Sequence, residues 1–273
     1  MSEPYIHGYT EREQARLSRM QAILNEAQLR EMDLRGVRSL VDVGCGLGQL
    51  TRAFARALPA GARVVGVERE ERQLREAIRL AAAAGESAAV EFRRGEAEGL
   101  PLAAVERGAF DLAHARFVLE HVANPLAVVR EMVGAVRRGG RVVLVDDDHD
   151  TLRLWPACPT FERAWRIYWE SYRDDGHDPL VGRRLAELLD VAGAAPTRVT
   201  SVFYGAVTGE PLFDGVVDNL AGVVGGAGEA LAARRRLSAA EMTDALTALA
   251  EWRREPAATL WYSLPLAEGV RPG

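Results

Sequence analysis

Lysine is missing from this chain of 273 residues, so all 34 basic side chains are arginine. The acidic residues number 39, and the net charge at pH 7 is −5. Binding to a nucleic acid usually requires a basic face, so this balance argues against a nucleic-acid partner. We interpret the absence of lysine as the codon bias of a GC-rich bacterium, without functional meaning.

Cysteine is scarce too, with Cys45 and Cys158 as the only two in the sequence. Two such residues form neither a disulfide framework nor a zinc-binding pattern, and they suit a reducing compartment. No apolar run approaches the roughly 18 residues of a membrane span, and the first residues lack the apolar core of a secretion signal. We therefore expect a cytoplasmic protein without a membrane partner.

Short apolar runs alternate with helical patterns up to about residue 148. Runs this short and continuous are typical of strands buried on both faces, in a parallel sheet wrapped by helices. Such a sheet binds its ligands outside the carboxyl ends of its strands. The predicted strands span residues 39–43, 62–68, 88–95, 110–116 and 141–148, and the predicted helices between them span 48–57, 71–85 and 124–140.

The segments outside this core follow other patterns. Thr10 and Glu13 form a capping box that predicts a helix from about residue 11 to 32, and Ser238 and Glu241 form a second one. We interpret residues 151–178, rich in Trp and Tyr, as a helical insertion with no partner strand. The rest predicts a helix over 179–193, a sixth strand over 197–206, a Gly- and Ala-rich helical segment with a loose connection at 221–228, and a seventh strand over 258–268.

We expect one domain over residues 1–273. Its parts are a cap helix (1–35), a ligand-binding core (36–148), a lid insertion (151–178) and the C-terminal part of the sheet with substrate-side helices (179–273).

Three glycines, Gly44, Gly46 and Gly48, follow the first strand in the stretch VDVGCGLGQLTRAF. A dinucleotide-binding fingerprint is G-x-G-x-x-G, so the third glycine comes one residue too early for it. Glycine lets the backbone approach a ligand closely, and the helix that follows offers free N–H groups. Tight turns also use glycine for steric reasons alone, and the spacing does not decide between the two interpretations.

Acidic residues follow the second and third strands. Glu68 lies 20 residues beyond Gly48, at the tip of the second strand, where a carboxylate can accept hydrogen bonds from both ribose hydroxyls. An ordinary surface glutamate is the alternative. Glu96 could accept an adenine amino group, with the N–H of Ala97 facing the ring.

These motifs in order resemble those of class I S-adenosylmethionine-dependent methyltransferases. The resemblance is closest to the branch with ubiquinone/menaquinone-biosynthesis-type and natural-product enzymes, and it covers about residues 36–148. It implies an α/β fold with a Rossmann-like, seven-stranded, mostly parallel sheet and helices on both faces. It also implies methyl transfer from S-adenosylmethionine to a small molecule, with S-adenosylhomocysteine as product. The stretches that carry it are DVGCGLG, VGVERE, RRGEAEGLP, FDLAHARFVLEHV and VRRGGRVVLVDDD.

The resemblance also implies roles for single residues. The loop would line the methionine part of the cofactor, the acids would hold ribose and adenine, and the residues after the fourth strand would border the methyl-donor end. Many relatives have Asp at the position of Glu96. The implied cofactor-binding residues are Asp42, Gly44, Cys45, Gly46, Gly48, Glu68, Arg69, Glu96, Ala97, Arg116 and Phe117, with Tyr5, His7 or Tyr9 closing over the cofactor.

Methyl transfer is an in-line displacement, which needs positioning and exclusion of water, and a general base only if the acceptor must lose a proton. His149, in the run DDDHD (146–150), is the first candidate base, with Asp148 able to orient it. The alternatives are a solvated loop or an acidic strand end that caps N–H groups. The spacing matches no metal motif, and we assign no metal. His121 is the second candidate, and His114 is expected in the core.

An aromatic stripe marks the insertion, because Trp165, Tyr168, Trp169 and Tyr172 are spaced i, i+3, i+4, i+7. It either seals the core or forms an aromatic wall for an apolar or planar substrate. Glu170, one position off the stripe, could also act as a base or pair with a cationic substrate. An anionic substrate group could instead meet Arg163, Arg166 and Arg173.

Two other functions stay open. The chain could be a regulatory module that keeps the cofactor pocket without catalysis, or a nicotinamide-dependent oxidoreductase, which the glycine spacing argues against. The C-terminal helices could support a homodimer.

Overall fold

The computed structural model describes residues 24–273, which form two compact units. The core unit consists of residues 28–148, 180–202 and 264–273, and the helical unit of residues 24–27, 149–179 and 203–263. The capping box expected at Thr10 and Glu13 and the residues Tyr5, His7 and Tyr9 lie outside the described residues. The single domain expected over 1–273 stays a prediction.

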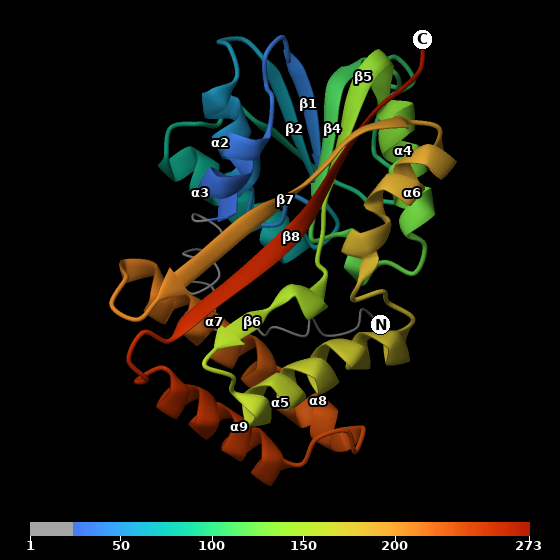
Figure 1. The fold of residues 1–273 in the computed structure, drawn as a ribbon. Coiled ribbons are helices and arrows are strands. Elements are labelled where there is room, and N and C mark those ends of the chain that lie inside the picture. Colours follow the sequence, from blue (N-terminus) through green and yellow to red (C-terminus); the bar gives the residue numbers. More distant parts are fainter. Residues whose placement is uncertain (1–23) are drawn as a thin grey trace. The chain divides into compact units, whose positions relative to one another are not determined.

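Five parallel strands form most of the sheet in the core unit (Figure 1). Their spatial order is β3-β2-β1-β4-β5, and the antiparallel neighbour of β5 is the end of β8. The mostly parallel sheet predicted from the alternating pattern is thereby confirmed. The strands are β1 (Ser39–Val43), β2 (Arg63–Glu68), β3 (Glu91–Arg94), β4 (Phe110–Arg116), β5 (Val136–Val145) and β8 (Thr259–Val270).

Helices cover both faces of this sheet (Figure 1). On one face, Val41 and Val43 of β1 join α4 (Pro125–Ala135) and α6 (Leu185–Ala192) in one hydrophobic cluster. On the other, α2 (Gln49–Ala57) and α3 (Glu71–Ala83) contact β2 and β3. Successive strand residues point to opposite faces, so Asp42 faces away from the cluster that holds its two neighbours.

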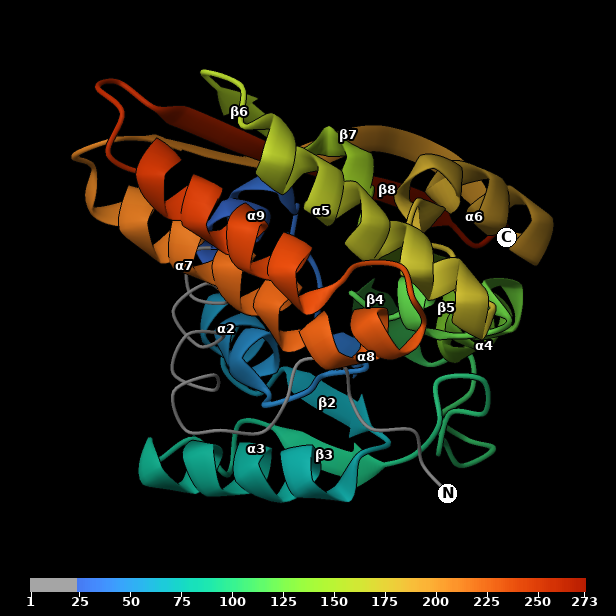
Figure 2. The ribbon, with the colours of Figure 1, turned by 90° about the horizontal axis from the view of Figure 1, so that it is seen from below.

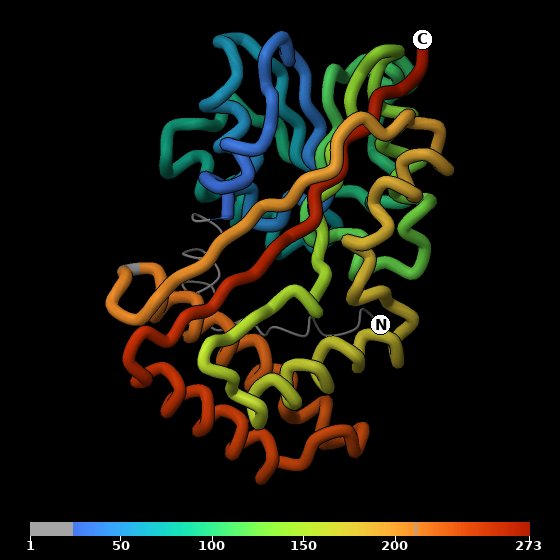
Figure 3. The backbone as a smooth tube through the Cα atoms, viewed as in Figure 1, coloured from blue at the N-terminus to red at the C-terminus, as the bar shows by residue number. Residues whose placement is uncertain are grey.

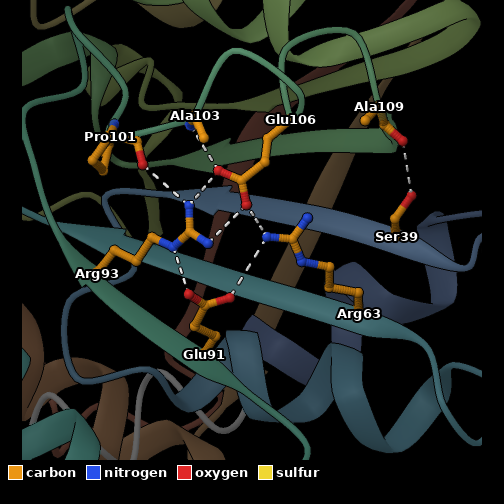
Figure 4. A network of polar contacts seen from close by, with 8 residues as sticks. All are labelled: Ser39, Arg63, Glu91, Arg93, Pro101, Ala103, Glu106 and Ala109. Atoms are coloured by element: carbon orange, nitrogen blue, oxygen red, sulfur yellow. Dashed lines mark hydrogen bonds and ion pairs between the residues drawn. The ribbon is translucent and has the colours of Figure 1, made fainter.

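An ion-pair network ties the amino ends of β2 and β3 to the loop before β4 (Figure 4). Glu106 accepts hydrogen bonds from Arg63 and from Arg93, and Glu91 pairs with the same two arginines. The two arginines lower the pKa of Glu106. This network lies at the amino ends of these strands, whereas the glycine loop follows the carboxyl end of β1.

The helical unit consists of helices, the short strand β6, the last residues of β7 (Ala195–Val207) and the first residues of β8. In it, α9 packs against α5, α7 and α8 (Figure 2). The predicted capping box of Ser238 and Glu241 is present at the start of α9. Among residues 24–273, no helix is both long and apolar enough to cross a membrane. The elements are β6 (Arg153–Trp155), α5 (Pro159–Glu170), α7 (Pro211–Gly226), α8 (Gly228–Ala233) and α9 (Ala239–Trp252).

The sheet has eight strands within residues 24–273, where the sequence predicted seven. The additional strand is β6, which pairs with Thr259–Trp261 of β8, so the insertion has a partner strand and the contrary expectation was wrong. β6 has three residues, of which only Leu154 is buried. A run this short cannot show the alternating pattern of a strand. The sixth predicted strand is β7 (Ala195–Val207), which runs beside β8 (Figure 3).

Other boundaries differ from the prediction as well; the third strand, for example, spans Glu91–Arg94 instead of 88–95. The helix expected over 124–140 ends at Ala135, and the next residues belong to β5, because the N–H of Gly139 donates to the carbonyl of Arg271 at 2.8 Å. The connection expected at 221–228 is helical up to Gly226. The helix that contains this segment is α7, which buries Val217, Leu220 and Val224, and this packing outweighs the low helix propensity of glycine.

Candidate functional site: the carboxyl edge of the sheet

The glycine loop is fixed to the end of β2 by its own backbone. The N–H groups of Gly44 and Cys45 both donate to the carbonyl of Val67, at 2.8 and 3.0 Å. All three loop glycines have positive φ angles, of 69°, 54° and 67° along the chain. Glycine adopts this conformation without the steric cost that a side chain would add.

Steric crowding explains two of the three glycines. A Cβ atom at Gly44 would lie 2.4 Å from Val118 Cγ2, and one at Gly48 would lie 2.4 Å from Cζ of Phe92. At Gly46 the nearest atom would be Oε1 of Gln73, at 3.2 Å. The steric interpretation therefore holds for Gly44 and Gly48, and it is compatible with a ligand above the loop.

Glu68, at the tip of β2, is buried and connects two backbone segments. Its Oε2 accepts from the N–H of Gly46 at 2.9 Å, and its Oε1 accepts from the N–H of Glu70 at 2.8 Å. Burial raises the pKa of Glu68, and these backbone hydrogen bonds oppose the rise. Burial, Asp42 and Glu68 also raise the pKa of the adjacent Cys45 thiol.

The other residues expected at the adenine lie at the same edge. Gly95 N–H donates to the carbonyl of Glu68 at 3.1 Å, which places the segment after β3 beside the tip of β2. Glu96 is exposed and forms an isolated bridge with Gly99, whereas Ala97 packs against the core cluster. The side chain of Arg69 is exposed.

Asp42 points into the protein. It lies opposite His114 in the β1–β4 register, and its Oδ1 is 2.7 Å from His114 Nδ1. Its Oδ2 accepts from the hydroxyl of Thr51 at 2.6 Å. The structure thus brings Asp42 to α2 and β4, and His114 is fully buried, as expected for a core residue.

Arg116 ends β4 as a buried cation. Its Nη1 donates to Oε1 of Gln28 at 3.0 Å, and its guanidinium carbon is 5.4 Å from the ring centroid of Phe117. Burial lowers the pKa of Arg116 to about 10, and the charges of Asp42 and Asp147 oppose this shift. Phe117 itself has a φ of 57°, a strained conformation for a residue with a side chain.

The acidic end of β5 is buried, so its interpretation as a solvated loop was wrong. Asp146 Oδ2 accepts from the N–H groups of Val118 and Leu119, at 3.0 and 2.8 Å. Its Oδ1 accepts from the N–H of Glu120 at 3.4 Å, at the start of the 3-10 turn Leu119–His121. The alternative interpretation, an acidic strand end that caps N–H groups, is therefore confirmed for Asp146.

Glu120 is a buried acid that the sequence interpretation did not single out. Burial, then the charges of Asp147 and Asp146, and a hydrogen bond to Asp147 raise its pKa well above the ordinary value. Burial and Asp147 raise the pKa of Asp146 to about 7. The only indication of this buried acid in the sequence was its position after an apolar strand. Its burial depends on residues at least 26 positions away in the chain, such as Asp146.

Asp148 pairs with Arg183 in the core unit. Its two oxygens accept from Nε and Nη2 of Arg183 at 2.7 and 3.0 Å. This bidentate contact ties the end of β5 to the 3-10 turn Val181–Arg184.

His149, the first candidate base, is buried among aromatic rings of the helical unit. The ring centroids of Trp165, Tyr168 and Tyr172 lie 5.5, 6.1 and 5.5 Å from its own. Its Nδ1 is 3.4 Å from the hydroxyl of Tyr262, and its carbonyl accepts from Nε1 of Trp165 at 2.8 Å. The predicted aromatic stripe thus packs around a histidine.

The stripe itself is buried, which favours its interpretation as a seal of the core. Exposed fractions of Trp165, Tyr168, Trp169 and Tyr172 are 8%, 1%, 7% and 1%. Glu170, also a candidate base, is half-buried beside this stripe.

One family model matches the part of the chain that forms this edge of the sheet. Residues 41–144, from β1 to the end of β5, match the model described as a methyltransferase domain. Within the core unit, residues 41–144 are thus similar to a methyltransferase domain. This agrees with the class I methyltransferase motifs found in the sequence.

Two curated relatives are similar to parts of this chain. An uncharacterized 37.1 kDa protein in a transposon of Streptomyces fradiae is 35% identical over 179 residues, which are 64% of this chain and 49% of that protein. The demethylmenaquinone methyltransferase of Lactococcus lactis is 28% identical over 158 residues, which are 58% of this chain and 56% of that enzyme. The chain thus spans about half the length of these relatives.

A solved structure has the same fold. It is the geranyl diphosphate C-methyltransferase of Streptomyces coelicolor in complex with Mg²⁺, geranyl diphosphate and S-adenosylhomocysteine. The TM-score is 0.58 at 16% identity, over 96% of this chain and 85% of that one. This likeness confirms the Rossmann-like fold expected from the sequence.

Proposed function

We propose that this chain is a methyltransferase that binds S-adenosylmethionine at the carboxyl edge of its sheet and transfers the methyl group to a small molecule. The observation that carries this proposal is Glu68, a buried carboxylate at the tip of β2 that faces the glycine loop. Ribose hydroxyls are donors, and a carboxylate in this position can accept from both of them. The methyltransferase domain model and the cofactor-bound neighbour of the same fold support the choice of cofactor.

The remaining part of the cofactor would follow the loop. The methionine carboxylate would lie at the N-terminus of α2, where the helix dipole favours an anion. The proposed adenine contacts are the Glu96 carboxylate and the Ala97 N–H, with exposed Arg69 beside the ring. Arg116 and Phe117 follow β4 and would border the methyl-donor end.

The net charge of −5 disfavours a polyanionic acceptor such as a nucleic acid, so we propose a small-molecule acceptor. His149 is the proposed general base, because its imidazole is buried among aromatic side chains that include Tyr262. Glu170 is the second proposed base. A base is needed only for an acceptor that loses a proton, in which case the proton passes from acceptor to base as the carbon–sulfur bond breaks.

Calorimetry with S-adenosylmethionine and S-adenosylhomocysteine tests cofactor binding. We expect both to bind the wild-type protein, and NAD(H) to leave its melting temperature unchanged. A ligand at 100 times its Kd stabilises a protein by about 2.7 kcal/mol, so a thermal shift separates these ligands clearly. Binding of NAD(H) with no binding of either methionine derivative would overturn the proposal in favour of an oxidoreductase.

The class of acceptor has a test of its own. The protein is incubated with methyl-labelled S-adenosylmethionine and with the small-molecule, protein and nucleic-acid fractions of a bacterial extract. We expect label in the small-molecule fraction. Label in a macromolecular fraction alone would contradict the acceptor class, and cofactor binding without label in any fraction would favour the regulatory module.

A further inference from the structure

A buried chain of hydrogen bonds runs through the core unit. It connects α2, β1, β4 and the helical residues 28–31 of the same unit. Two of its contacts, described above, join Asp42 to Thr51 and to His114. In the other two, Gln28 Nε2 lies 2.6 Å from His114 Nε2, and Arg116 Nη1 donates to Gln28 Oε1 at 3.0 Å.

The Arg116 guanidinium fixes the orientation of the Gln28 amide. A guanidinium carries donors only, so the Gln28 atom that faces it is the amide oxygen. The NH₂ group therefore faces His114. The same NH₂ group is 3.4 Å from the sulfur of Met32, a weak acceptor that suits its second hydrogen.

The amide orientation in turn fixes the proton of His114. Because the NH₂ group of Gln28 donates, Nε2 of His114 must accept, and a neutral imidazole then carries its hydrogen on Nδ1. That N–H donates to Asp42, whose other oxygen accepts from Thr51. All the donors and acceptors named here are matched in a single arrangement.

We propose that Gln28 is a positioning residue that holds the Nδ1–H tautomer of His114 and the guanidinium of Arg116 at the same time. A hydrogen on Nε2 would place two N–H groups face to face. Relief would require the amide to turn, which would present its NH₂ group to Arg116. Because Gln28 is fully buried, either mismatch leaves polar groups without partners, and such groups are costly.

The link matters for the site because Arg116 ends β4 at the ligand-binding edge. Its role at the methyl-donor end rests on the proposed function. Through Gln28, the helical residues 28–31 would set the position of that cation and, through His114, the position of Asp42 in β1.

Imidazole ¹⁵N NMR of the wild-type protein at pH 8 tests the tautomer directly. The chain has 5 histidines, and the signals of His114 are assigned by their loss in His114→Gln. We expect a protonated Nδ1 and an unprotonated Nε2. A hydrogen on Nε2 would overturn the proposal, whatever the protein binds.

Gln28→Glu reverses the requirement. A carboxylate has acceptors only, so it keeps a partner in Arg116 but demands a hydrogen on Nε2 of His114. We expect the Nε2 signal to become that of a protonated nitrogen. Arg30→Gln changes the charge equally at an exposed position of the same segment and should keep the wild-type pattern. Identical His114 signals in Gln28→Glu and wild type would contradict the proposal.

Gln28→Met tests the link to the site, and replaces Gln28→Glu in the NMR test if that variant does not fold. We expect a mixture of His114 tautomers and an affinity for S-adenosylhomocysteine about 10-fold lower, as for the loss of one hydrogen bond to a charged group. Arg30→Gln should bind like wild type. If the tautomers change but the affinity does not, the proposed link from Gln28 to the cofactor site through Arg116 is wrong. If the wild-type protein does not bind the cofactor product at all, the proposed function is wrong, but the tautomer result still stands.

Discussion

The amide of Gly46 donates to Oε2 of Glu68 at 2.9 Å, so that the loop after β1 and the tip of β2 share one buried carboxylate. The same carboxylate accepts from the N–H of Glu70 through its other oxygen. Glu68 therefore holds the loop in shape before any ligand binds. Ribose hydroxyls would add donors to acceptors that are already in position, which reduces the ordering that binding requires.

Glu68→Gln should lower the affinity for S-adenosylhomocysteine by roughly 10-fold or more, because hydrogen bonds to a charged group contribute about 1.5–3 kcal/mol. Calorimetry measures this, with the exposed Glu98→Gln as the matched control. Burial raises the pKa of Glu68, so wild-type affinity should fall as the pH falls through that pKa. Equal affinities of Glu68→Gln and wild type would refute the ribose contact.

Gly48→Ala should destabilise the protein more than Gly36→Ala. Both glycines have positive φ angles, 67° and 76°, but an added Cβ meets Phe92 only at Gly48 and nothing within 4 Å at Gly36. We expect about 1–2 kcal/mol for the left-handed conformation at either site, and a further 1–3 kcal/mol for overpacking at Gly48. Urea denaturation measures the difference, and Phe92→Leu should restore part of it. Equal losses would show that Phe92 moves away freely.

Glu120→Gln should weaken the dependence of stability on pH. The folded-state pKa values of Glu120 and Asp146, the latter about 7, are raised above their ordinary values. The folded protein therefore holds these protons more tightly, and their contribution to stability is present at low pH and lost as the pH rises through about 7. Gln keeps a neutral group of the same shape.

The free energy of unfolding, measured in urea at pH 5, 6, 7 and 8, should thus fall less steeply with pH in Glu120→Gln than in wild type. Glu98→Gln, an exposed carboxyl of the core unit, should follow the wild-type curve. Parallel curves for Glu120→Gln and wild type would show that Glu120 does not titrate in this range.

Ser238→Ala should cost about 1 kcal/mol of stability, within the range for the loss of an N-cap hydrogen bond. The Ser238 hydroxyl accepts from the N–H of Glu241 at 3.2 Å, and Glu241 Oε2 accepts from the N–H of Ser238 at 2.9 Å. Thermal unfolding measures the loss, with the exposed Ser87→Ala as control. A Ser238→Ala melting temperature equal to that of the control would mean that α9 is held by packing alone.

The sequence by itself determined the order of strands and helices in the core, because short apolar runs and capping residues are local signals. The capping box at Ser238 and the place of Glu68 at the end of β2 were both predicted in this way. The motifs in chain order also predicted the similarity to a methyltransferase domain that residues 41–144 show. In each of these cases the decisive residues lie close together in the sequence or follow a fixed spacing.

Only the tertiary structure decided how distant side chains pair. Gln28 and His114 are 86 positions apart, and Asp146 caps a turn 27 positions before it in the chain. β6 has three residues and exists because β8 offers a partner edge. The burial of the acids after β5 could not be predicted from the sequence either, because an acidic run without periodicity resembles a solvated loop. Pairing across a sheet depends on register and packing, and no local pattern of residues encodes either.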